Sequence, residues 1–156
     1  MEPPASRIAE KTAGPRVKQF SIFLPNKVGA LSEVVKVLHD HSVHVLALNV
    51  QDSADSAIVR IVVSDPEQVH DLLGIHAIPF SESNIVAVEL REGATQLPKL
   101  LSSLLMAEVN IHGIYGLLTH PGGNTALALH VEDNDCAVAV LRSHGFRVLD
   151  QMDISR

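Results

Sequence analysis

Residues 20–38, "FSIFLPNKVGALSEVVKVL", have a second version in the same chain, residues 86–104, "VAVELREGATQLPKLLSSL". Setting Phe20 against Val86 gives an offset of 66 residues (86 − 20), and leucines then coincide at three positions: Leu24 with Leu90, Leu31 with Leu97, and Leu38 with Leu104. A two-residue insertion in "THPGGN" changes the offset to 68 (133 − 65), which sets Asp65 against Asp133. The chain therefore contains two copies of one unit.

The first copy has the pattern of a β-α-β-β-α-β unit. Apolar and polar residues alternate over 17–24, which predicts a strand with one buried face. Apolar residues from Leu31 to Leu38 follow the i, i+3, i+4, i+7 spacing of an amphipathic helix. Two β-branched runs on either side of "DSADS" predict a hairpin. A second helix is expected from Pro66 to Leu73, with Gly74 ending it and "HAIPF" as a short last strand.

The second copy repeats the order, with expected strands at 84–91, 109–118, 124–132 and 146–151 and helices at 95–108 and 134–144. Such a unit is an α+β, ferredoxin-like fold, an antiparallel four-stranded sheet with both helices on one face. We expect a flexible tail at 1–16 and two units at 17–83 and 84–154. Because each unit has only about 70 residues, its open sheet surface should be covered by edge-to-edge or back-to-back pairing.

Composition restricts the classes of function. The formal net charge of −6, with scattered lysines and arginines, disfavours nucleic-acid and anionic-membrane binding. Aromatic residues make up only 3%, too few for base-stacking platforms. The single cysteine, Cys136, excludes an internal disulfide framework and fits a reducing compartment. No secretory signal or apolar run near the ~20 residues of a membrane span is apparent, so a cytoplasmic location is expected.

The loop "PNKVGAL", residues 25–31, joins the first strand to the first helix. A helix entrance exposes unpaired backbone N–H groups and the positive end of the helix dipole, so it favours a carboxylate or phosphate. Gly29 would let the backbone approach such a ligand closely. In the alternative interpretation, Asn26 only caps the turn and Gly29 only provides an unusual φ angle.

The tandem order of strand, "N-x-x-G-x-L" loop, helix, hairpin, helix and strand resembles the ACT domain family of small-molecule sensors, over residues 17–154. The resemblance implies that a free amino acid or similar metabolite binds between two paired units. The loop of one unit and the start of the second strand of its neighbour would form that site. The residues implied are Asn26, Lys27, Val28, Gly29, Ala30 and Leu31 of the loop and Asn110, Ile111 and His112 of the strand.

The second loop, "REGATQL", departs from this pattern. Glu92 stands in the position of Asn26 and Thr95 in that of Gly29, while His44 corresponds to Asn110. A carboxylate at that position would repel the carboxylate of a ligand. We therefore expect this second site to be empty and sealed by a Glu92–His44 interaction.

Other constellations predict no chemistry of their own. The histidines of "HDHSVH" have no spacing that brings three metal ligands together, and no nucleophile elbow or acid–base pair is apparent. The chain is thus expected to be a non-catalytic sensor, without metal or cofactor, that forms a homodimer and regulates an amino-acid metabolic enzyme or regulator in trans. A regulatory subunit of a biosynthetic enzyme and a structural oligomerisation module without ligand remain as alternatives.

Overall fold

The computed structural model describes residues 14–155. The first copy contains β1 (Val17–Pro25), α2 (Ala30–Asp40), β2 (Val45–Asp52), β3 (Ser56–Val63), α3 (Pro66–Ile75) and the start of β4 (Phe80–Leu90). The second copy contains the end of β4, then η1 (Gly93–Gln96), α4 (Leu97–Met106), β5 (Ile111–Gly116), η2 (Pro121–Gly123), β6 (Thr125–Val131), α5 (Asn134–Ser143), β7 (Val148–Leu149) and α6 (Gln151–Ile154). The expected tail at 1–16 lies largely outside the described residues. Of its last residues, Arg16 forms an ion pair with Asp135 (2.6 Å).

One strand, β4, is shared by the two copies. Its residues 80–85 pair antiparallel with β1, and its residues 86–90 pair antiparallel with β6. The resulting strand order is β2-β3-β1-β4-β6-β5, with the short β7 also paired to β4. The chain therefore runs without a linker through the expected junction between residues 83 and 84.

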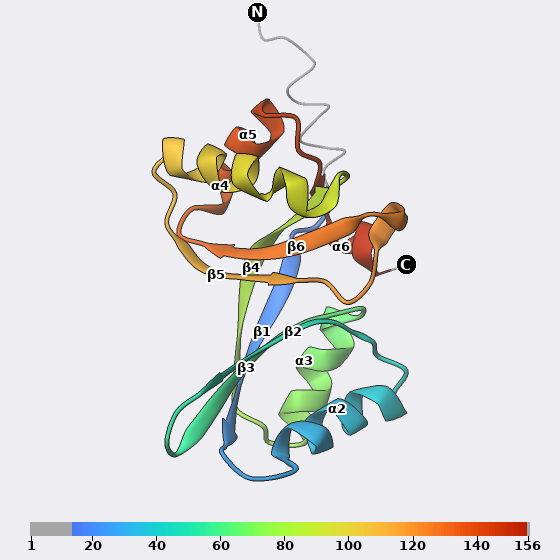
Figure 1. Cartoon of the computed structure of the whole chain (residues 1–156). Helices are drawn as coiled ribbons and strands as arrows, with labels where there is room; N and C mark the ends of the chain where they lie inside the picture. Colours follow the sequence, from blue (N-terminus) through green and yellow to red (C-terminus); the bar gives the residue numbers. More distant parts are fainter. Residues whose placement is uncertain (1–13, 156) are drawn as a thin grey trace, which may run out of the picture.

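The two halves of the sheet pack against each other on the faces that carry no helix (Figure 1). Helices α2 and α3 cover the outer face of the first half, and α4 and α5 cover the outer face of the second. A third apolar core lies between the inner faces, formed by Val17, Leu46, Ala47, Val62, Ile85, Ala87, Tyr115, Ala126, Ala128, Leu149 and Ile154. Back-to-back packing thus buries the surface that each small unit leaves open.

Buried polar contacts fix the register of this inner interface. The hydroxyl of Tyr115 donates to Oε1 of Gln19 (2.6 Å), and both side chains are buried. The amide of Gln151 donates to the carbonyl of Val63 (3.0 Å). Because a buried polar group left without its partner costs free energy, these bonds favour one arrangement of the two copies.

The backbone repeats with the offsets found in the sequence. A residue with positive φ lies two positions after the last residue of each of the four long helices: Ser42 (59°) and Glu108 (56°) are 66 residues apart, and Ala77 (54°) and Gly145 (86°) are 68 apart. In every case, the N–H of the next residue donates to a carbonyl in the last turn of the helix, as Val43 does to Leu38 and Ile78 does to Leu73. These left-handed turns are the usual way to satisfy the last helix carbonyls.

Several expected boundaries were wrong. Gly74 lies inside α3, which ends at Ile75. Of "HAIPF", His76 and Ala77 form a turn in which Ala77 is left-handed, Pro79 has no N–H to donate, and Phe80 is the first residue of β4. The expected helix at 95–108 begins as the 3₁₀ turn η1 and becomes α-helical at Leu97, where Pro98 suits a first turn. The expected strand at 146–151 ends at Leu149, because Asp150 and Asp153 form a capping box that starts α6.

His130 makes the stability of the folded chain depend on pH. Burial, followed by the positive charges of His112 and Arg60, lowers the pKa of His130 below the ordinary 6.5. The unfolded chain therefore binds a proton here at a higher pH than the folded chain, and stability is lost as pH falls from about 6.5 through the lower folded pKa. Urea unfolding at pH 7.5 and 5.5 should show a smaller acid-induced loss for His130→Gln than for the unaltered protein. An equal loss in both would contradict this assignment.

Candidate functional site

The loop between β1 and α2 contains the unusual φ angle that the alternative interpretation assigned to Gly29. Gly29 is the N-cap residue of α2 and has φ 91°, in the left-handed region that L-residues rarely adopt. A Cβ added to Gly29 would have no neighbour within 4 Å, so the space beside the residue is open. The position therefore favours glycine because of its backbone conformation and not because of crowding.

At this helix entrance, the backbone N–H groups of Leu31 and Ser32 have no acceptor among residues 14–155, whereas those on either side of them do. The Ala30 N–H donates to the carbonyl of Lys27 (3.2 Å), and the Glu33 N–H donates to that of Gly29 (2.9 Å). No acceptor is found there for the N–H groups of Leu31 and Ser32, and α2 has no side-chain cap. Together with the helix dipole, these two N–H groups favour an anion.

Asn26 connects the loop to the β2–β3 hairpin. Its side-chain amide donates to the carbonyl of Ser53 (3.2 Å), and its backbone N–H donates to that of Asp55 (3.4 Å). Asn26 therefore does not cap α2. Its amide oxygen is left as an acceptor beside the groove described next.

A groove of about 290 Å³ lies between the loop and the hairpin, lined by Leu24, Pro25, Asn26, Lys27, Ala30, Leu31, Val50, Asp52, Ala57 and Val59. Leu24 and Val59 are buried and give the groove an apolar floor, while Asp52 supplies the only carboxylate in its lining. The sequence analysis missed the hairpin residues. Nothing in the sequence signals them, because only the register of β2 and β3 against β1 brings them to the loop.

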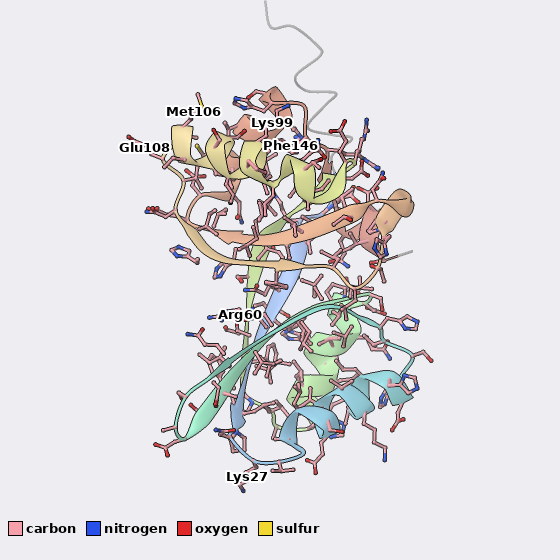
Figure 2. All side chains as sticks on the ribbon, viewed as in Figure 1. Lys27, Arg60, Lys99, Met106, Glu108 and Phe146 are labelled. Carbon is pink, nitrogen blue, oxygen red and sulfur yellow. The ribbon has the colours of Figure 1, made fainter. Side chains whose placement is uncertain are left out.

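Asn110, Ile111 and His112, the other half of the expected site, lie elsewhere in the chain. Asn110 donates to Glu132 (2.7 Å), and the ring of His112 lies against that of His130, with 5.4 Å between centroids. In Figure 2, Lys27 and Glu108, two residues before Asn110, lie at opposite ends of the molecule. Strand β2 is joined to the residues that follow β5 by the Ala47–Leu117 bridge and by the hydrogen bond from the Leu118 N–H to the Leu46 carbonyl. A single chain therefore does not bring the two halves together.

The expected seal of the second loop was wrong: Glu92 and His44 form no ion pair among residues 14–155. The backbone N–H of His44 donates to Ser64 Oγ (2.9 Å) instead. In the second loop, the hydroxyl of Thr95 donates to the carbonyl of Glu92 (2.8 Å), and the side chain of Gln96 accepts from the Glu92 N–H (3.0 Å). Side chains of the loop itself thus satisfy backbone groups near this helix entrance.

The described part of the chain contains no cluster of three or more His, Cys, Asp or Glu side chains able to hold a metal ion. None of its helices is long and apolar enough to cross a membrane.

The repeated fold makes this chain a tandem pair of small α+β modules, and the first module has an open helix entrance. A family profile described as an ACT domain pair matches residues 16–156, and the chain belongs to this family. ACT domains are regulatory modules, and the earlier resemblance is confirmed.

Solved structures have the same fold. Protein BT0572 from Bacteroides thetaiotaomicron is 27% identical with a TM-score of 0.81, over 90% of this chain and 96% of that one. The ligand-free regulatory subunit of aspartate kinase from Thermus thermophilus is 14% identical with a TM-score of 0.58, over 84% of this chain and 91% of that one. No curated protein sequence gives a significant match.

Proposed function

We propose that the chain is a non-catalytic sensor that binds a free amino acid in the groove beside Gly29. The observation that carries this proposal is the pair of N–H groups, on Leu31 and Ser32, that have no acceptor within the described part of the chain and lie at the edge of a groove that also contains a carboxylate. A ligand with one negative and one positive group matches this arrangement better than a simple anion does.

Each part of an amino acid has a counterpart in the groove. Its carboxylate accepts from the N–H groups at the entrance of α2, with Lys27 adding positive charge. Its ammonium group donates to Asp52 and to the amide oxygen of Asn26. Its side chain packs on the apolar floor formed by Leu24 and Val59, which favours an apolar or small side chain.

A second subunit would complete this site. Strands β2 and β5 are the two edges of the sheet, and Leu48, Val50 and Ile114 on them are exposed apolar residues. In a twofold dimer, β5 of one subunit would pair antiparallel with the free half of β2 of the other. That pairing would place Asn110, Ile111 and His112 of the partner subunit next to the groove. Ligand binding would then be coupled to dimerisation.

We propose that the sensor acts in trans, in the cytoplasm, on an enzyme or regulator of amino-acid metabolism. Two solved structures with this fold are regulatory subunits of aspartate kinase, which supports the idea at the level of fold. In the alternative that the chain is itself a regulatory subunit of a biosynthetic enzyme, it should co-purify with a catalytic partner. A purely structural oligomerisation module would show sedimentation unaffected by any metabolite.

Thermal unfolding in the presence of each of the twenty amino acids tests the proposal. A ligand at 100 times its Kd should stabilise the folded state by about 2.7 kcal/mol, which raises the Tm by several degrees. One amino acid, or a few of similar shape, should give this shift, and sedimentation should show a larger dimer fraction with the same ligand. A folded protein whose Tm responds to none of the twenty would refute the proposal.

A further inference from the structure

The second copy differs from the first at a pair of positions where the backbone is the same. In the first copy, the Phe23 N–H donates to the carbonyl of Pro79 (3.0 Å). In the second, the Glu89 N–H donates to the carbonyl of Arg147 (2.9 Å), and these residues lie 66 and 68 positions further along. The repeat thus keeps the hydrogen bond and replaces an apolar pair by a charged pair.

These charged residues form a partly buried ionic cluster. The Glu89 side chain is only 2% exposed, and its two oxygens accept from Arg91 Nε (2.8 Å) and Arg147 Nη1 (3.2 Å). Arg147 Nη2 lies 3.3 Å from Asp153 Oδ1. The two contacts of Arg147 are long for charge-assisted hydrogen bonds, which are usually about 2.7–2.9 Å. Its guanidinium, with five N–H donors, therefore retains capacity for another acceptor.

Two further features found only in the second copy enclose the space beside this cluster. The two-residue insertion forms the β5–β6 connection, where an added Cβ on Gly122 would lie 3.8 Å from Glu89 Oε2. The C-terminal helix α6 supplies Asp153 and lies next to that connection (Figure 1). Between them is a cavity of about 240 Å³, lined by Thr119, His120, Pro121, Gly122, Arg147, Leu149 and Asp153.

We propose that this cavity is a second binding site, for a small zwitterion that carries a carboxylate and a protonated amine. The guanidinium of Arg147 and the imidazole of His120 donate to the carboxylate, and Asp153 accepts from the amine. Leu149 and Pro121 provide the apolar wall. The cavity is smaller than the roughly 300–1,000 Å³ typical of sites for drug-sized ligands, which limits the ligand to the size of a simple metabolite.

The charge arrangement favours a zwitterion over an ion of one sign. Glu89 and Asp153 together balance Arg91 and Arg147, so a bare anion would leave the cluster with uncompensated negative charge. A zwitterion adds one charge of each sign, each next to its opposite. Two carboxylates and two guanidinium groups therefore remain neutralised when the ligand is bound.

Backbone amide NMR of the full chain, titrated with each of the twenty amino acids, tests this site. At least one amino acid should shift the amides of residues 119–123 and 151–154 in a saturable manner. Asp153→Asn should raise the Kd read from these amides at least tenfold. His120→Ala, at an exposed loop position outside the ionic cluster, should raise it several-fold without affecting the fold.

The same spectra separate this site from the groove beside Gly29. Shifts confined to residues 26–33 would overturn the second site and leave the proposed function intact. Shifts confined to 119–123 and 151–154 would support the second site and refute the groove. If none of the twenty shifts the amides of 119–123, or if both variants bind as the unaltered protein does, the second site is overturned.

Discussion

Replacing Gly29 by valine should greatly weaken the binding of the amino acid ligand to this protein. The φ of 91° at Gly29 is a conformation that a β-branched residue strongly disfavours, at a cost of order 1–3 kcal/mol. No atom lies within 4 Å of an added Cβ, so the effect arises from the backbone and not from a clash. The loop would relax and turn the N–H groups of Leu31 and Ser32 away from the groove.

Gly93→Val is the matched control, because Gly93 also has positive φ (64°) and open space around its Cβ, but lies in the second loop. Both variants should lose stability in the absence of ligand. Isothermal titration calorimetry should show at least a tenfold increase in Kd for Gly29→Val and an almost unchanged Kd for Gly93→Val. Similar binding by both variants would mean that the groove beside Gly29 is not the ligand site.

The repeat made most of the fold predictable from the sequence. Local patterns located the strands β1, β2, β3 and β6, because period-two alternation and β-branched runs reflect contacts within one small unit. The offsets of 66 and 68 reappear in the left-handed residues that follow the helices. Boundaries failed where one local feature overrode the pattern, as at Pro79 and at the capping box of Asp150.

Features that depend on contacts between distant segments were not predictable. Four polar residues (81–84) are followed by an apolar run (85–88), and no local signal shows that one strand, Phe80–Leu90, serves both copies. Asp52 reaches the groove through the register of the hairpin. The expected Glu92–His44 pair depended on how the two copies pack against each other, which no local pattern shows. The cluster around Glu89 was missed because alternation assigns a charged residue to the exposed face.

The shared strand and the inner core predict that the two copies unfold as one unit. Ile85 lies on β4 where the strand passes from one copy to the other, is 1% exposed, and packs in the core between the two halves of the sheet. Ile85→Ala should lower the free energy of unfolding by about 2–4 kcal/mol, since it removes buried methyl groups and leaves a cavity that rigid strands cannot close.

Ile75→Ala makes the same chemical change at a residue that is 77% exposed, and it should alter stability by less than about 0.5 kcal/mol. Urea unfolding at a fixed protein concentration, followed by the amide signals of Ile22 and Leu100, reports on the first and second cores separately. Both signals should disappear in one transition, which Ile85→Ala shifts as a whole to lower urea. Two separated transitions, or a shift of only one signal, would show that the copies are independent domains. A substitution in a core that both copies share should destabilise both copies together.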